Sequence, residues 1–217
     1  MNSHKDLIKL YKKQFKKFGD SVKSQLTPKG RNNIRYSSVL DYINFDEKIR
    51  ILDYGCGLGY FYEYLMLRAN KIEYSGVDIV DDFIIHCKNK FPEKKDSFYT
   101  IKHNQKIKGK YDIVFASGVF NLKSFNNEKK SLKFAYKRIK ELFESTNQIL
   151  ICDFPSEFVD FKQSHAQHFN TSDLISFCVN ELSRRFIFRH DLLPYECTLI
   201  VWKDDKIVKP QNTYEVK

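Results

Sequence analysis

The sequence of 217 residues predicts an α/β fold, a three-layer doubly wound sheet of seven strands. The sheet is expected to be mostly parallel, with an antiparallel C-terminal hairpin and with N-terminal helices that precede it. Short apolar runs alternate with amphipathic segments through the middle of the chain, which is typical of parallel strands joined by helices. The last two apolar runs are separated by a loop too short for a helix, and such a gap permits only an antiparallel hairpin.

Residues 1–45 predict a helical cover for a cofactor or an acceptor. A helix is expected over residues 1–20, because apolar side chains recur there at spacings of three and four while lysines occupy the opposite face. Gly19 is expected to end this helix. A second helix is predicted for residues 34–44, after a loop that contains proline and glycine.

The core of the predicted single domain comprises residues 46–203, and residues 204–217 form a tail. Apolar segments, separated by residues that favour loops, define the predicted strands and helices. The expected strands are 49–53, 74–79, 97–102, 111–116, 148–154, 185–190 and 196–202. The expected helices are 60–67, 81–90, 128–143 and 171–182, the last with Thr171 or Ser172 as its N-cap.

The composition indicates which kinds of partner the protein binds and in which cellular compartment it is found. A formal net charge of +10 favours anionic partners, such as nucleic acid or phosphorylated small molecules, although the lysines are scattered as on solvated helix faces. The five cysteines form no C-x-x-C pair and predict buried, reduced thiols. No apolar run approaches the roughly 18 residues needed to span a bilayer. These features predict a soluble cytoplasmic protein with no metal site, since carboxylates do not cluster.

A glycine-rich turn follows the first predicted strand, where doubly wound sheets bind their ligands. Gly55, Gly57 and Gly59 allow positive φ angles and close approach of a ligand to the backbone. The helix that follows contributes free N–H groups, which suit a carboxylate as well as a phosphate. The dinucleotide fingerprint needs a glycine where Tyr60 stands, and the Gly-Lys-Ser/Thr of a phosphate-binding loop is absent.

Two acidic residues flank this turn. Asp53 stands two positions before the first glycine, where an acid suits a cofactor that carries an ammonium and a sulfonium group but no phosphate. Asp78 ends the second predicted strand, where a carboxylate can accept hydrogen bonds from both ribose hydroxyls. The alternative is that Asp53 only caps the next helix and that Asp78 is an ordinary loop acid.

With these motifs the sequence resembles the class I S-adenosylmethionine (SAM) dependent methyltransferases over about residues 45–203. The segments that carry the resemblance are Asp53-Tyr54-Gly55-Cys56-Gly57-Leu58-Gly59, Gly76-Val77-Asp78-Ile79 and Tyr111-Asp112-Ile113-Val114-Phe115-Ala116-Ser117-Gly118. It implies SAM as cofactor and S-adenosylhomocysteine (SAH) as product. It also implies that Gly55 and Gly57 lie under the methionine part and that Asp78 holds the ribose. Ser117 and Gly118 would flank the methionine and the acceptor, and Cys56 and Ile79 complete the expected contacts.

The resemblance has one departure, in the loop after the third predicted strand. Many members of the family carry an acid near the adenine there, whereas this chain has Lys102-His103-Asn104-Gln105. Asn104, through its amide, is therefore the candidate adenine contact. From the N-terminal helices, Tyr11 and Arg35 are the candidate cofactor contacts, and Arg31 could pair with an anion in the same way.

Methyl transfer from SAM is an in-line displacement, and a hydroxyl acceptor needs a base. His190 and Asp153 are the candidate catalytic residues, because both lie near the carboxyl ends of predicted strands, at the ligand-binding edge. His165 and His168, in the loop after the fifth strand, are further candidates. For each histidine, the alternative is a surface or core-edge side chain without a catalytic role.

The residues favour O-methylation of a small, anionic or glycan-linked acceptor, such as a precursor of a capsule or lipopolysaccharide. Short segments, among them Phe18-Gly19-Asp20-Ser21 and Arg35-Tyr36, resemble a subgroup that tailors small molecules or surface glycans. An RNA methyltransferase and a non-catalytic partner with the same fold are the alternatives; net charge supports the former, and the intact glycines argue against the latter. Tyr60 and the terminal hairpin oppose an NAD oxidoreductase. The oligomeric state is left open.

Overall fold

The computed structural model describes residues 4–44, 46–68 and 71–204, whose strands form one sheet in the order β3-β2-β1-β4-β5-β7-β6. The strands are β1 (Ile49–Tyr54), β2 (Ile72–Asp78), β3 (Phe98–Thr100), β4 (Tyr111–Ala116), β5 (Thr146–Pro155), β6 (Phe186–Leu193) and β7 (Glu196–Trp202). The helices are α1 (His4–Phe18), η1 (Val22–Gln25), α2 (Arg31–Leu40), α3 (Tyr60–Met66), α4 (Asp81–Lys90), η2 (Pro92–Ser97), α5 (Glu128–Glu144), α6 (Thr171–Phe177) and η3 (Cys178–Leu182).

The sheet is mixed, as the sequence predicts. Strands β3, β2, β1, β4 and β5 pair in parallel, whereas β7 pairs antiparallel with both β5 and β6. The turn between β6 and β7 consists of Pro194 and Tyr195, which is too short for a crossover. The predicted doubly wound sheet with its antiparallel C-terminal hairpin is therefore confirmed.

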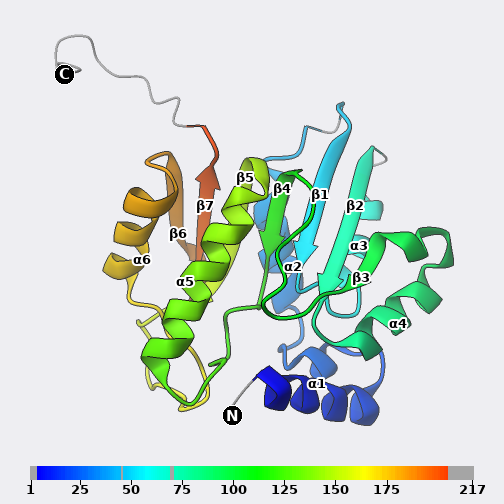
Figure 1. Cartoon of the computed structure of the whole chain (residues 1–217), viewed down its shortest axis with the longest axis horizontal. Coiled ribbons are helices and arrows are strands. Elements are labelled where there is room, and N and C mark those ends of the chain that lie inside the picture. Colours follow the sequence, from blue (N-terminus) through cyan, green and yellow to red (C-terminus); the bar gives the residue numbers. More distant parts are fainter. Residues whose placement is uncertain (1–3, 45, 69–70, 205–217) are drawn as a thin grey trace.

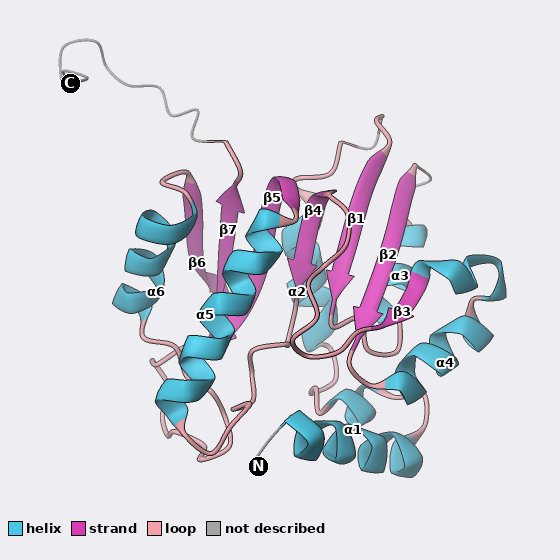
Figure 2. Cartoon of the chain, in the orientation of Figure 1, coloured by secondary structure: helices cyan, strands magenta, loops and turns pink. Residues whose placement is uncertain are grey.

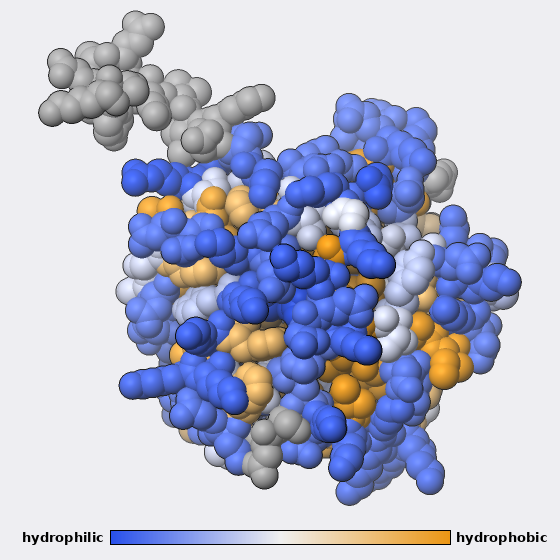
Figure 3. Space-filling model, in the orientation of Figure 1, coloured by the Kyte–Doolittle hydropathy of each residue, from blue (hydrophilic) through white to orange (hydrophobic). Residues whose placement is uncertain are grey.

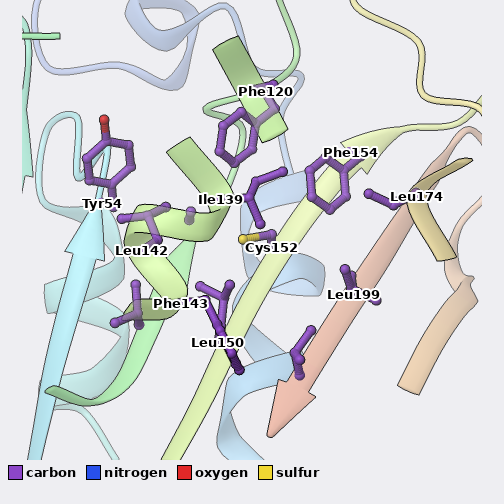
Figure 4. Packing of buried hydrophobic residues seen from close by; sticks show 14 of the residues in the cluster. Tyr54, Phe120, Ile139, Leu142, Phe143, Leu150, Cys152, Phe154, Leu174 and Leu199 are labelled. Carbon is purple, nitrogen blue, oxygen red and sulfur yellow. The ribbon is translucent and has the colours of Figure 1, made fainter. Parts of the chain in front are cut away.

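Each face of the sheet has its own hydrophobic core. Alternate residues of β1 point to opposite faces, so Leu52 belongs to one cluster and Ile51 to the other. In Figure 1, α5 and α6 lie in front of the sheet, and α2 and α3 lie behind it. Figure 4 shows the front core, where Leu150 and Cys152 of β5 face Leu142 of α5. Burial on both faces explains why the central strands read as continuous apolar runs.

Several element boundaries differ from those predicted. Helix α2 starts at Arg31 because Gly30, with a φ of 86°, turns the chain into it. The N-cap of α6 is Asn170, whose side chain accepts a hydrogen bond from the backbone N–H of Asp173 at 2.9 Å; the choice of Thr171 or Ser172 was wrong. The predicted helix 171–182 is an α-helix followed by a π-helical turn. Except for Asp204, the predicted tail lies outside the described residues.

Helix α1 lies along the edge of the sheet where the parallel strands end. In Figure 2 the arrowheads of the central parallel strands point toward this helix. Tyr11 and Phe15 of α1 contact the ring of Phe83 in α4, with centroids 6.0 and 5.5 Å apart. Lys12 adds an ion pair to Asp81 at 2.5 Å. The helical preface is thus held against the edge at which the glycine turn lies.

The described residues carry three further features that bear on function. No helix among them is long and apolar enough to cross a membrane. All five cysteines are buried and unpaired, in line with the prediction of buried thiols. Within the same part of the chain, no group of three or more His, Cys, Asp or Glu side chains is arranged to hold a metal ion.

Candidate active site

A cavity opens at the carboxyl ends of β1, β2 and β4. Counting its mouth, it encloses about 1230 Å³, which is enough for a ligand larger than a nucleoside. The glycine turn and the ends of the strands form its floor, and α1, η1 and α2 form its cover. In Figure 3 the visible face is mostly hydrophilic, with apolar side chains between α4 and α5 above α1. Leu7, Phe83 and Phe134 of these three helices line the cavity.

The glycine turn is shaped so that its backbone, rather than side chains, faces the cavity. Gly55 has a φ of 84°, and a Cβ atom added there would lie 2.4 Å from Cγ2 of Val119. Gly57 has a φ of 55°, and the amide of Gln25 from the cover occupies the space beside it. An L-residue at either position would be strained and would fill the cavity floor.

Gly59 serves a different purpose from the other two glycines. It adopts a φ of 78° and caps the start of α3. A Cβ atom at this position would meet the ring of Phe91 at 2.7 Å, on the side away from the cavity. Gly59 therefore allows α3 to pack against the end of α4, and it does not line the cavity.

The two predicted acids lie on the cavity wall in different settings. Asp53 accepts a hydrogen bond from the hydroxyl of Tyr74 at 2.6 Å, and burial raises its pKa to about 7. Because the N-cap of α3 is Gly59, Asp53 does not cap that helix. Asp78 accepts hydrogen bonds from the backbone N–H groups of Gly57 and Val80, at 2.9 and 2.8 Å. Burial raises the pKa of Asp78 to about 6.

A buried ionic cluster joins the cover to the C-terminal hairpin. Glu196, the first residue of β7, accepts hydrogen bonds from Nε and Nη2 of Arg35 at 2.7 Å each. Arg31, one turn earlier on α2, donates to the same carboxylate at 2.8 Å. Arg35 and Glu196 are buried, so the pair holds α2 over the edge of the sheet. Sequence reasoning missed Glu196; its only signal is an acid at the start of an apolar strand.

Asp153 lies beneath the loop that follows β4. Its Oδ1 accepts a hydrogen bond from the backbone N–H of Gly118 at 2.7 Å and lies 3.9 Å from Nε of Arg35. Burial raises the pKa of Asp153, and the Arg35 charge opposes that rise. A Cβ atom at Gly118, whose φ is 70°, would lie 3.4 Å from Nη1 of Arg35. Asp153 thus supports the loop, and Arg35 reaches the cavity beside Gly118.

The opposite end of the cavity is aromatic and basic. The ring of His4 stacks on His103, with centroids 4.0 Å apart, and contacts Phe134 at 4.6 Å. Arg138 of α5 donates hydrogen bonds to the backbone carbonyls of His103 and Gln105. Burial and the nearby charge of Arg138 lower the pKa of His4 to about 4. Sequence reasoning did not select these residues, because α1 and the loop after β3 are far apart in the chain.

A second cavity of about 1640 Å³, its mouth included, adjoins the first on the side of the hairpin turn. Leu122 lines both cavities, and its backbone forms an antiparallel bridge with Ala166, which lines the second. His165 and His168 line the second cavity. His190 lies on β6, with its ring centroid 6.1 Å from that of the exposed Phe158.

The structure brings most of the predicted site residues together. Those that line the first cavity are Tyr11, Arg35, Asp53, Gly55, Cys56, Gly57, Asp78, Ile79, Ser117 and Gly118. Those outside the lining of both cavities are Gly59, Asn104, Asp153 and His190. Asn104 is exposed in the loop that Arg138 holds. The catalytic role of His190 and Asp153 stays a prediction.

Comparison with known proteins agrees with this geometry. Residues 52–143 match a family described as "Methyltransferase domain". The chain is 30% identical over 87 residues to a malonyl-[acyl-carrier protein] O-methyltransferase of Acetivibrio thermocellus, covering 39% of this chain and 31% of that protein. The enzyme of the same name from Priestia megaterium is 29% identical over 97 residues, covering 44% of this chain and 35% of its own length. The chain thus spans about a third of the curated relatives that it matches.

Solved structures show the same fold. Magnesium protoporphyrin IX methyltransferase from Synechocystis PCC 6803, with bound SAH, superposes with a TM-score of 0.60 at 17% identity, over 80% of this chain and 83% of that one. The pyocyanin biosynthetic protein PhzM superposes with a TM-score of 0.62 at 11% identity, over 89% and 62% of the two chains. Residues 52–143 are therefore similar to a methyltransferase domain, and the chain has the fold of the class I SAM-dependent methyltransferases.

Proposed function

We propose that the protein binds SAM in the first cavity and transfers its methyl group to an oxygen of a small acceptor. The observation that carries this proposal is the floor of that cavity, where the backbone of Gly55 and Gly57 and the carboxylate of Asp78 meet. The same turn lacks the features that bind pyrophosphate, since Tyr60 replaces the third glycine of the dinucleotide pattern.

The residues of the cavity fit the parts of SAM. Because Gly55 and Gly57 have no side chains, their backbone is exposed on the cavity floor, which suits a methionine chain lying close to it. Each carboxylate oxygen of Asp78 has a free lone pair beyond the backbone bond it accepts, so the group can take both ribose hydroxyls. Oε1 of Gln25 is buried with no hydrogen-bond partner among the described residues, which suits the methionine ammonium as a donor.

When bound, SAM supplies an electrophilic methyl group, and the chain contributes orientation and exclusion of water. Helices α1 and α2 cover the cavity, and Arg35 presents Nη1 beside Gly118. Asp153 holds the N–H of Gly118 and so sets the loop where cofactor and acceptor are expected to meet. These residues position the reacting groups, because no step needs a covalent bond to the protein.

Oxygen is the proposed target atom because both curated relatives are named O-methyltransferases. The net charge of +10 favours an anionic acceptor by attracting it to the surface. A glycan precursor finds less support, because the named relatives act on a malonyl-[acyl-carrier protein] or a magnesium protoporphyrin, and the second cavity has apolar as well as polar walls. The proposed acceptor is therefore a small anion with an apolar part.

The experiment is calorimetric titration of the protein with SAH, followed by incubation with methyl-labelled SAM and cell extract. We expect SAH to bind, and Asp78→Ala to weaken binding by about 1–3 kcal/mol, the usual effect of lost hydrogen bonds. Asp112→Ala is the matched control, because Asp112 also accepts a backbone N–H, from Arg50 at 2.9 Å, but does not line the cavity. A wild-type protein that binds neither SAH nor SAM would overturn the proposal.

A further inference from the structure

The second cavity contains a histidine with a single defined tautomer. His168 follows β5, and its Nδ1 lies 2.8 Å from the carbonyl oxygen of Ser156. A carbonyl oxygen can only accept a hydrogen bond, so Nδ1 carries the ring proton. In the neutral ring, Nε2 is then an acceptor with a lone pair directed away from Ser156.

Nε2 of His168 is buried and has no hydrogen-bond partner among the residues that the structure describes. A buried polar atom without a partner is unfavourable, and such atoms in native proteins usually meet a ligand or an ordered molecule. His168 lines the second cavity, which makes a ligand bound there the candidate partner of Nε2. The other histidine of this cavity, His165, is exposed to solvent and needs no such partner.

The walls around His168 are mainly apolar and come from four separate segments. Leu26 belongs to the cover, Leu122 to the loop after β4, Phe161 to the loop after β5 and Tyr195 to the hairpin turn. Phe161 is 71% exposed and Leu26 and Tyr195 are each 42% exposed, so apolar surface is open at this site. Burial of an apolar group against these side chains would remove that surface from water.

We infer that the second cavity is the acceptor site, where apolar walls hold the acceptor's body and Nε2 of His168 accepts a hydrogen bond from a hydroxyl on it. This inference rests on the proposed function, and it adds the class of acceptor: a molecule with an apolar body and a hydroxyl group. An acceptor site must adjoin the cofactor, and the second cavity adjoins the cofactor cavity at Leu122, which lines both. Arg31 and Glu196 of the ionic cluster also line it, and their partner Arg35 lines the cofactor cavity.

The test uses two fluorescent probes, 6-hydroxy-2-naphthoate and 2-naphthoate, which differ only in the hydroxyl group. Both are titrated into the 217-residue protein saturated with SAH. We expect the hydroxylated probe to bind about fivefold more tightly, the effect of one buried hydrogen bond. His168→Asn should abolish this preference, because an asparagine amide can still donate toward the carbonyl of Ser156 but offers nothing in place of Nε2.

Two further variants make the outcome specific. His165→Asn changes the exposed histidine of the same cavity and should keep the fivefold preference. Phe161→Ala should weaken both probes equally, which would locate them in this cavity. Equal binding of the two probes to the wild type, or an undiminished preference in His168→Asn, would overturn the inference. Tight SAH binding in either case would leave the proposed function intact, whereas loss of SAH binding in the wild type would remove both.

Discussion

Glu196 provides the sharpest test of how the helical cover is held. Glu196 is 7% exposed, and its carboxylate contacts two arginines of α2 at 2.7 to 2.8 Å. Removal of one partner from a buried ion pair destabilises a protein by about 3–5 kcal/mol, because the other charge is left unpaired. Here Asp153 remains 3.9 Å from Arg35, and the Arg31 side chain, at 31% exposure, reaches water. Both features lower the expected loss.

For Glu196→Gln, which keeps the volume and one acceptor, we therefore expect a loss of about 2 kcal/mol in the free energy of unfolding. In a chain of this size that corresponds to a fall in Tm of about 4–8 °C. Differential scanning calorimetry with and without SAH measures it, and SAH affinity should fall as well because Arg35 lines the cofactor cavity.

Glu181→Gln is the matched control for this variant. Glu181 pairs with Lys140 at 2.6 Å, but both side chains are 48% exposed, so solvent screens the pair and no measurable change in Tm is expected. If Glu196→Gln has the Tm and the SAH affinity of Glu181→Gln, the ionic cluster does not hold the cover, and the reasoning fails.

Three other predictions follow from the geometry. Gly55→Ala should abolish SAH binding. Gly30→Ala is the control, because Gly30 has a nearly equal φ of 86° but open space around its Cβ position, and this variant should still bind SAH. Equal affinities of the two variants would contradict the proposed role of the turn. The fold raises the pKa of Asp53 from 3.8 to about 7. Its contribution to stability is therefore fully present below pH 4 and is lost as the pH rises to about 7. Asp53→Asn, which can still accept from Tyr74, should lack this loss, so its Tm relative to wild type should rise between pH 4 and pH 8. Asn170→Ala removes the N-cap of α6 and should cost about 1 kcal/mol in urea denaturation, with no effect on SAH affinity.

The order of elements and the cofactor turn could be predicted from the sequence because short-range patterns determine them. The apolar run of β1 leads into Gly55 and Gly57 within a few residues, and the positive φ angles of that turn require glycine. The two-residue turn before β7 likewise permits only a hairpin. Helix boundaries were harder to predict. At the start of α6 several adjacent residues have side chains able to cap a helix, and only the structure shows that Asn170 is the N-cap.

The sequence by itself therefore determined the fold class, the cofactor turn and the acids beside it. Only the tertiary structure decided which distant residues complete the site. Arg35 and Glu196 are separated by 161 positions, and the amide of Gln25 lies beside Gly57, yet no periodicity in the chain relates these pairs. They meet because α1, η1 and α2 pack on the edge of the sheet where the parallel strands end, and that placement depends on the summed burial of many side chains. The same packing encloses His168 in a second cavity and leaves His190 outside both.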